Sequence, residues 1–260
     1  MNLSLLTYNT LFNNAADKLG KVIDDYHPDI ICLQEALTDD SNIKKIEKFG
    51  YKIADYSNSF VKFGIIFGVI TFYNPETIKY KDSYSLNLNT NVGEYFFYLL
   101  RVILGFNQLK TFLETTFVCK KTDMTITVCN VHLFVIGSNS LRIKDIDQAL
   151  KTLNIERKKY FIIAGDFNYF PYQRKKLEKI MKKYGLKEAT DKINQTIKFS
   201  NNGSFENFNL FQRFSTKIVN VLFKNLKIDY IFYRGLHLKK TERIEVRYSD
   251  HYPIISTYKI

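Results

Sequence analysis

One short stretch near the middle of the chain limits the folds that this sequence can adopt. Residues 160–164, YFIIA, form an almost wholly apolar run, which is typical of a strand buried on both faces of a sheet. Gly165, Asp166, Phe167 and Asn168 follow directly, where the strand should end. Since residues i and i+2 of a strand point to the same side, Asp166 and Asn168 are expected to face one spot, with Gly165 allowing another group close. The alternative is an ordinary polar turn, which Asp and Asn commonly form.

Strand and helix signals alternate along the rest of the chain. Further strands are predicted by the runs LSLLTYN, DIICLQE and FGIIFGVITFY, by the hairpin FLETTFVCKKTDMTITVCNVHLF, and by KIDYIFY and RIEVRYSDHYPIISTYKI. Apolar residues at helical spacing predict helices over residues 15–26, 143–153 and 177–184, and a short polar helix near residues 41–49. Residues 74–111 and 188–225 fit no simple pattern. Because hairpins accompany the helices, the mixture favours a layered α/β sandwich over a strictly parallel, doubly wound sheet.

No repeat, Pro- or Gly-rich linker or low-complexity tract divides the 260 residues. We therefore expect a single domain over residues 1–260, with an apolar insertion around residues 84–111. The most apolar part of this insertion, residues 92–106, contains Glu94 and Arg101 and is too short to span a bilayer. The first residues do not resemble a signal peptide, and Cys32, Cys119 and Cys129 are scattered without a CxxC pair. These features predict a cytoplasmic monomer with buried, reduced thiols.

The chain is strongly basic, with 38 Lys and Arg against 26 Asp and Glu and a formal net charge of +12. Such an excess favours an anionic partner, which can be nucleic acid, an acidic membrane surface or a phosphate ester. A solvated basic surface without a partner is the alternative. Charge by itself does not choose between these.

Polar residues recur where the apolar runs end. Alone, each is explained as a turn former, but together they place carboxylates, histidines and amides where one sheet edge would collect them: Asn9, Glu35, Asn130, His132, Asp166, Asn168, Asp229, Asp250 and His251. Oxygen-rich sets of this kind suit Mg²⁺, which is held by one or two carboxylates and keeps several waters. Cysteine is absent from the set and no HExxH motif occurs, so zinc is disfavoured.

These residues also carry a family resemblance. The segments TYNTLFN, LQEA, NVHL, AGDFN, IDYIF and SDHYPI, between residues 4 and 257, have the order and rough spacing seen in the endonuclease/exonuclease/phosphatase superfamily, whose members are DNase I-like. The resemblance implies a four-layered α/β/β/α sandwich with two packed mixed β-sheets. It implies a metal-dependent phosphoric ester hydrolase that uses Mg²⁺, with Mn²⁺ as a substitute. One departure is that many relatives have SR or SK at the end of the third strand, where this chain has ITFYNPE.

The same resemblance assigns roles to the residues. Asn9, Glu35 and Asp250 are the implied metal ligands, and the implied catalytic set is His132, Asp166, Asn168, Asp229 and His251. Asp166 would activate a water that Asn168 holds in line, and His251, oriented by Asp229, would bond a non-bridging phosphate oxygen. His132 would contact the phosphate or assist the leaving group.

Three hypotheses for the substrate remain open from the sequence. A nuclease acting on DNA or RNA comes first, because the basic segment PYQRKKLEKIMKKYGLK can attract a polyanion, although a solvated helix face explains it equally well. A phospholipid phosphodiesterase of the neutral sphingomyelinase type is second, with residues 92–106 docking on membranes, and a buried element is the alternative for that segment. A catalytically dead binding module is disfavoured because every implied position is filled, and inositol phosphatase activity has little support.

Overall fold

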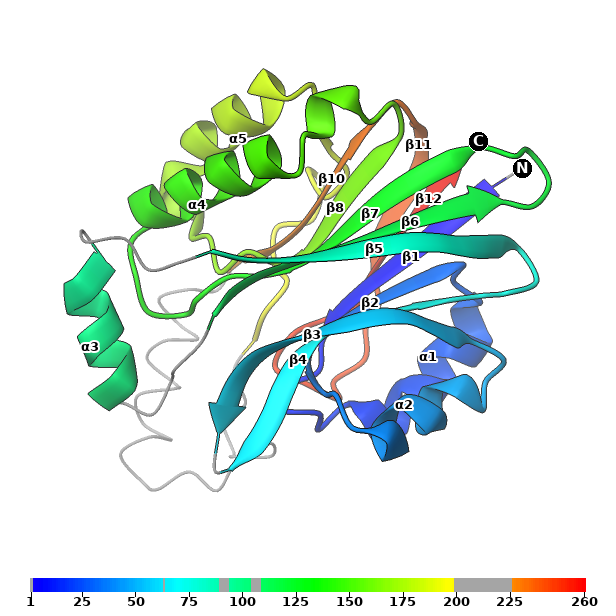
Figure 1. Ribbon diagram of the computed structural model, residues 1–260, viewed down its shortest axis with the longest axis horizontal. Coiled ribbons are helices and arrows are strands. Elements are labelled where there is room, and N and C mark those ends of the chain that lie inside the picture. Colours follow the sequence, from blue (N-terminus) through cyan, green and yellow to red (C-terminus); the bar gives the residue numbers. More distant parts are fainter. Residues whose placement is uncertain (1, 63, 89–93, 104–108, 199–225) are drawn as a thin grey trace.

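The computed structural model describes residues 2–62, 64–88, 94–103, 109–198 and 226–260, which build two packed β-sheets (Figure 1). The first sheet has the order β11 (His237–Arg243), β12 (Ile254–Lys259), β1 (Asn2–Asn9), β2 (Ile30–Leu37), β4 (Ile65–Tyr73) and β3 (Lys52–Lys62). The second has the order β5 (Ile78–Leu88), β6 (Lys110–Cys119), β7 (Thr125–His132), β8 (Phe161–Asp166), β10 (Asp229–Arg234) and β9 (Lys187–Glu188). Both sheets are mixed, since β1–β2 and β7–β8 are parallel and the other pairs are antiparallel.

Helices cover the outer face of each sheet and complete four layers (Figure 1). The first sheet packs against α1 (Leu19–Tyr26) and α2 (Asp40–Glu47), and the second against α4 (Asn139–Thr152) and α5 (Arg174–Lys183). A third apolar core fills the space between the sheets, with side chains such as Leu5 and Cys32 facing Val128 and Ile162. The predicted α/β/β/α sandwich is confirmed.

Burial on both faces explains why the central strands read as apolar runs. In β1, Leu3 and Leu5 enter the core between the sheets, whereas Leu6 and Tyr8 pack toward the helices. Asn9 comes four residues after Leu5, so its side chain points the same way, between the sheets, at the carboxyl end of the strand. Asn2 pairs with Lys259, and both chain ends lie at the opposite end of the molecule (Figure 1).

Four strands were not predicted from the sequence. These are the edge strands of the two sheets, β3, β5, β9 and β11, in which many side chains are exposed and the apolar alternation is weak. The segment predicted as one strand through FGIIFGVITFY begins later, because Gly64 lies in the turn between β3 and β4 with φ of 77°. Residues 244–253 connect β11 to β12 without forming a strand, which frees Asp250 and His251 to approach the other residues.

Within the predicted apolar insertion, residues 84–88 belong to β5 and residues 110–111 to β6. The described helix of this region is α3 (Tyr95–Ile103), while residues 92–93 and 104–106 of the predicted docking segment lie outside the described residues. Lys110 anchors the start of this helix through buried ion pairs of 2.9 Å to Glu94 and 2.8 Å to Asp145 of α4. Within the described ranges, no helix is long and apolar enough to cross a bilayer.

Candidate active site

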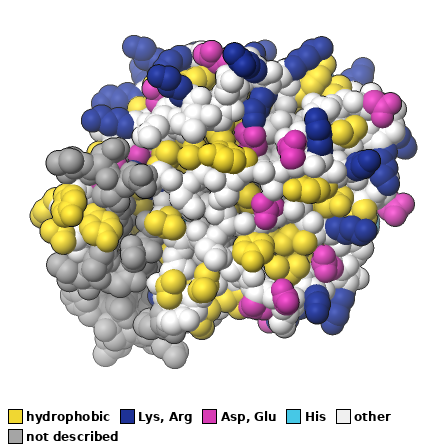
Figure 2. All heavy atoms as spheres, in the orientation of Figure 1, with side chains coloured by type: hydrophobic (Ala, Val, Ile, Leu, Met, Phe, Trp, Pro, Cys, Tyr) yellow, Lys and Arg dark blue, Asp and Glu magenta, His cyan; other side chains and the backbone are white. Residues whose placement is uncertain are grey.

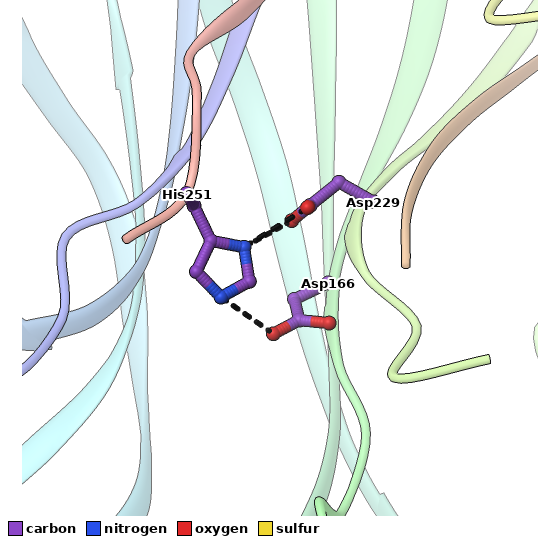
Figure 3. Close-up of side chains that lie close together, drawn as sticks. All are labelled: Asp166, Asp229 and His251. Carbon is purple, nitrogen blue, oxygen red and sulfur yellow. Dashed lines mark hydrogen bonds and ion pairs between the residues drawn. The ribbon is translucent and has the colours of Figure 1, made fainter. Parts of the chain in front are cut away.

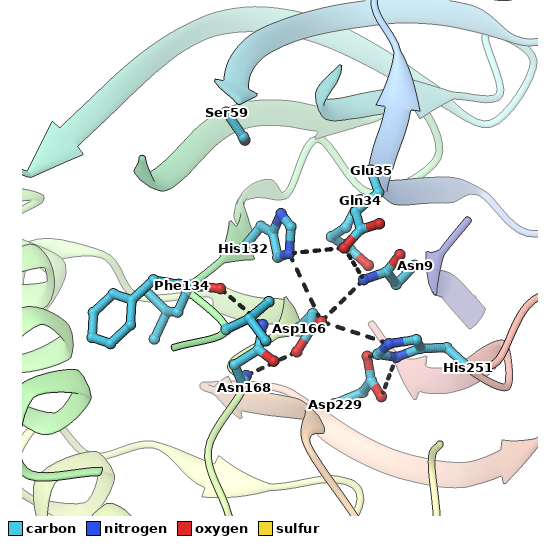
Figure 4. A network of polar contacts seen from close by, with 12 residues as sticks. Asn9, Gln34, Glu35, Ser59, His132, Phe134, Asp166, Asn168, Asp229 and His251 are labelled. Carbon is cyan, nitrogen blue, oxygen red and sulfur yellow. Dashed lines mark hydrogen bonds and ion pairs between the residues drawn. The ribbon is translucent and has the colours of Figure 1, made fainter. Parts of the chain in front are cut away.

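The predicted site residues meet at the carboxyl ends of β1, β2, β7 and β8 (Figure 4). The first sheet supplies Asn9 and Glu35, and the second supplies His132 and Asp166 at strand ends and Asp229 at the start of β10. His251 reaches the same point from the loop before β12. We call this end of the sandwich the catalytic edge.

The Asn9 amide joins the carboxylates of the two sheets. Its Nδ2 donates to Asp166 Oδ2 at 3.0 Å and to Glu35 Oε1 at 3.3 Å. All three side chains are buried. Two of the three residues predicted as metal ligands, Asn9 and Glu35, therefore lie in one cluster with the predicted general base.

A distortion of β2 aims Glu35 at this cluster. The register between β2 and β4 shifts between Leu33 and Ala36, which indicates a bulge, and Glu35 has φ of 52°. Bulges of this kind re-aim side chains, and left-handed backbone is uncommon for residues other than glycine. The N–H of Phe12 donates to Glu35 Oε2 at 3.2 Å and fixes the rotated carboxylate.

Gly165 lets β7 and β8 approach closely beside Asp166. A Cβ at this position would lie 2.1 Å from the carbonyl oxygen of Val131, and the φ of Gly165 is 142°. The close approach predicted from the sequence is therefore made by the neighbouring strand.

Asn168 lies beside Asp166, but not by strand alternation as predicted. The strand ends at Asp166, and Asn168 turns back with φ of 48°, so that its N–H donates to Asp166 Oδ1 at 2.8 Å. Its Nδ2 donates to the carbonyl of Leu133 at 2.8 Å. A turn therefore creates the proximity of these two residues.

His251 and Asp229 form a buried pair (Figure 3). Nδ1 of His251 lies 2.9 Å from Asp229 Oδ2, and Nε2 lies 3.8 Å from Asp166 Oδ2. The Ser249 hydroxyl accepts from the His251 N–H at 3.1 Å, and Thr196 Oγ1 accepts from the Asp229 N–H at 3.1 Å. The imidazole is thus fixed with one nitrogen toward the site.

The two histidines of the site have opposite electrostatics. Burial would lower the pKa of His251, but the charges of Asp229 and Asp250 outweigh it and raise the pKa well above its ordinary value. Burial and the neighbouring His251 lower the pKa of His132 to about 3. His132 Nε2 lies 3.6 Å from Glu35 Oε1 and 3.8 Å from Asp166 Oδ2, so a neutral imidazole faces these carboxylates.

The carboxylates fit a divalent cation. Burial and the charge of Asp250 raise the pKa of Glu35 to about 7, and burial and the charge of Asp229 raise that of Asp166 to about 7. Burial also raises the pKa of Asp250. Several acidic oxygens thus share a buried place with an amide, which is the donor chemistry of Mg²⁺. Asp166, Asp229 and His251 also have ligand atoms within 4.8 Å of one another, but His251 Nδ1 is already hydrogen-bonded to Asp229.

Sequence reasoning placed Asn130 at this edge of the sheets but missed the other supports of the site. Gln34 Nε2 donates to Asn130 Oδ1 at 2.7 Å, and Asn130 Nδ2 donates to the carbonyls of Leu33 and Ile70, so Asn130 ties the two sheets together. Thr196 and Ser249, which hold Asp229 and His251, are not marked by any motif. A buried polar residue on an apolar strand, such as Gln34, was the one signal available.

The fold and the site define a class of enzyme in which two sheets converge on a buried cluster of carboxylates and histidines. The model of the Endonuclease/Exonuclease/phosphatase family matches residues 6–251, so the chain belongs to this family, as its motifs indicated. Members of the family are phosphoric ester hydrolases, and the chain is an enzyme of that kind. A search among curated proteins found no similar sequence.

Solved structures share the fold across the chain. The human Nocturnin catalytic domain has a TM-score of 0.70 at 17% identity, and the match covers 99% of this chain and 94% of that one. A mannosyl-6-phosphatase from Bacteroides thetaiotaomicron has a TM-score of 0.67 at 17% identity, covering 99% and 100%. D. rerio TDP2 complexed with a single-strand DNA product has a TM-score of 0.67 at 14% identity, covering 100% and 99%. At these identities the likeness concerns the fold.

Proposed function

We propose that the chain is a Mg²⁺-dependent phosphodiesterase that acts as a single-domain monomer, with water attacking phosphorus in line with the leaving oxygen. The observation that carries this proposal is the position of the Asp166 carboxylate. It lies 3.0 Å from the amide of Asn9 and 3.8 Å from the imidazole of His251, so the proposed base, metal-binding group and phosphate-binding group surround one point.

Glu35, with Asn9 and Asp250, would hold the cation. When bound there, Mg²⁺ neutralises phosphate charge and stabilises the leaving oxygen, and Mn²⁺ can substitute for it. The Glu35 carboxylate is fixed by the N–H of Phe12, so it is oriented before any ion binds. Such fixed oxygen ligands reduce the reorganisation that binding requires.

Asp166 accepts the proton of the attacking water. A raised pKa suits this task, since a general base works best when its pKa lies near the working pH. Asn168 fixes Asp166 through its N–H and leaves its amide oxygen beside the carboxylate to orient the water. The two residues thus act as one unit.

His251 stabilises the negative charge that builds on the phosphate. Asp229 holds the imidazole through Nδ1 and favours the protonated ring, so that Nε2 donates to a non-bridging oxygen. His132 is neutral and contributes as a hydrogen-bonding group next to Glu35 and Asp166 rather than as a cation.

Nucleic acid is the proposed substrate. The chain enters α5 soon after Asn168 of the site, and the first turn of this helix exposes Lys175 and Lys176. Tyr172, just before the helix, is 70% exposed and stacks on Phe170 with ring centroids 6.2 Å apart. This pair offers a base an aromatic surface beside two cations that can contact the phosphate backbone.

A phospholipid phosphodiester is the second candidate substrate. The observation that favours it is α3, whose aromatic side chains Tyr95 and Phe96 are exposed although the helix is strongly apolar. A membrane substrate would give such a helix a place to bury these rings.

The proposal is tested by supplying two substrates in parallel, in Mg²⁺ and in EDTA. Labelled single- and double-stranded nucleic acids form one set, and vesicles of sphingomyelin and mixed phospholipids form the other. We expect Mg²⁺-dependent cleavage of nucleic acid, and a loss on the order of 10²–10³ in rate for Asp166→Asn and for His251→Ala. Release of a phospho-headgroup instead would select the second candidate.

The matched control is His237→Ala, which removes an exposed histidine of β11. His237 pairs with Lys259, at the end of the first sheet away from the catalytic edge. This variant should retain the wild-type rate. Near-normal turnover in well-folded Asp166→Asn or His251→Ala protein would contradict the proposed roles.

A further inference from the structure

We propose that the catalytic edge docks on an anionic lipid-bilayer surface through two exposed apolar elements, α3 and the turn between β3 and β4. The contacting side chains form what we call the apolar rim: Val61, Ile65, Ile66, Tyr95, Phe96 and Leu99. This surface is separate from the residues that act on the phosphate, and the inference holds for either substrate class.

The rim is exposed to a degree that is unusual for such side chains. Phe96 is 70% exposed and Tyr95 is 60% exposed, and about half of each of the four aliphatic side chains is exposed. Figure 2 shows hydrophobic side chains gathered on the left of the molecule, over α3. Several exposed apolar side chains on one element mark an interaction site more often than scattered single residues do.

Strand pairing places both elements at the catalytic edge. Phe67 of β4 pairs with Leu37 at the end of β2, so the preceding residues Ile65 and Ile66 extend beyond the strand that carries Glu35. α3 lies between the end of β5 and the start of β6, where Thr111 pairs with His132. Both elements of the rim therefore lie toward the end of the sandwich that carries the site (Figure 1).

Buried contacts hold α3 in this position. Glu94, directly before the helix, and Asp145 of α4 both bind the Lys110 ammonium, which is only 3% exposed. The N–H of Leu109 also donates to the carbonyl of Ser59 in β3 at 2.7 Å, which connects the end of the insertion to the hairpin. The exposed rings of α3 are thus attached to the body of the enzyme.

The chemistry of the rim favours a lipid surface over nucleic acid. Four of its six members are aliphatic, and aliphatic side chains neither stack on bases nor pair with phosphates. α3 has nine residues, which is too short to span a bilayer but suits a helix lying in the interface. The net charge of +12, with Lys175 and Lys176 exposed in the helix that follows the site, complements an anionic headgroup layer.

Vesicle sedimentation tests this inference without requiring catalysis. The full chain is mixed in EDTA with vesicles of phosphatidylcholine alone, or of phosphatidylcholine with phosphatidylglycerol. We expect stronger binding to the anionic vesicles, and about tenfold weaker binding for Phe96→Ser combined with Leu99→Ser, and for Ile65→Ser combined with Ile66→Ser. Tyr84→Ser removes a ring that is 53% exposed from the middle of β5 and should bind like the wild type.

Two results would overturn the proposal: absence of binding to either vesicle, and binding that the rim variants leave unchanged. If vesicle binding is absent and the rim variants bind oligonucleotides more weakly, the rim is a nucleic-acid surface instead. Circular dichroism and thermal melting of each variant show whether it is folded. Because sedimentation measures binding and not turnover, a failed phosphodiesterase assay leaves this test intact.

Discussion

At the residue scale, the groups around each histidine of the site, rather than the residue type, determine whether its ring is charged. His132 and His251 are both buried, and the Asp229 carboxylate lies against Nδ1 of His251. The pKa values of the two histidines shift in opposite directions. Burial disfavours an imidazolium, and two nearby carboxylates reverse that effect. The cationic histidine is therefore specified by Asp229 and Asp250.

Asp229→Asn tests this dependence. We expect a rate loss on the order of 10²–10³ with an unchanged fold, because an amide keeps the shape but no longer favours the protonated ring. Steady-state rates and melting curves measure the two effects. Asp147→Asn, which alters a partly exposed carboxylate of α4 paired with Lys183, should keep the wild-type rate. An equal rate in Asp229→Asn would show that His251 does not act as a cation.

At the scale of elements, β7 and β8 approach each other so closely that only glycine fits between them. In Gly165→Ala, the new Cβ would meet the Val131 carbonyl at 2.1 Å, and neither backbone can yield without disturbing the paired strands. We expect the free energy of unfolding to fall by about 2–4 kcal/mol. Denaturant titration measures this loss.

Gly64→Asn is the control for that substitution. Gly64 also has a positive φ, but a Cβ added there would meet nothing within 4 Å, and asparagine tolerates left-handed backbone. We expect a loss of about 1 kcal/mol or less. Equal losses at both positions would show that backbone conformation, not the approach of Val131, governs Gly165.

The elements also show which parts of the fold the sequence could predict. Both faces of β1, β2 and β8 are buried, so these strands are apolar runs and were predicted. The edge strands β3, β5 and β11 have exposed and buried side chains mixed along them, so they contain no apolar run and were not predicted. The site residues were predicted from motifs at strand ends. The bulge that orients Glu35 and the turn that brings Asn168 back to Asp166 were not predicted, because both depend on backbone geometry that distant contacts determine.

At the scale of the whole molecule, the three cysteines report on the integrity of both sheets. Cys32, Cys119 and Cys129 are free and buried, as predicted. Burial raises the pKa of Cys32 to about 12 and that of Cys119 to about 11, and raises that of Cys129 well above its ordinary value. Since the thiolate is the reactive form, native thiols should be nearly inert.

A thiol-specific reagent at mild alkaline pH tests this expectation. In native protein, none of the three thiols should react rapidly with the reagent, whereas in denaturant all three should react. Mass spectrometry of trapped fragments identifies which cysteine reacts first. Rapid labelling of Cys32 in native protein would contradict the close packing of the two sheets.

The division of the site between the two sheets has a consequence for how the enzyme acquires activity during refolding. Asn9 and Asp166 are 157 residues apart in the sequence, and their hydrogen bond forms only after the sheets have docked. Contacts between residues so far apart in the sequence form late, because ordering the intervening chain costs entropy before the contact can stabilise the protein. Turnover should therefore return together with the last step of assembly, after the secondary structure has already recovered.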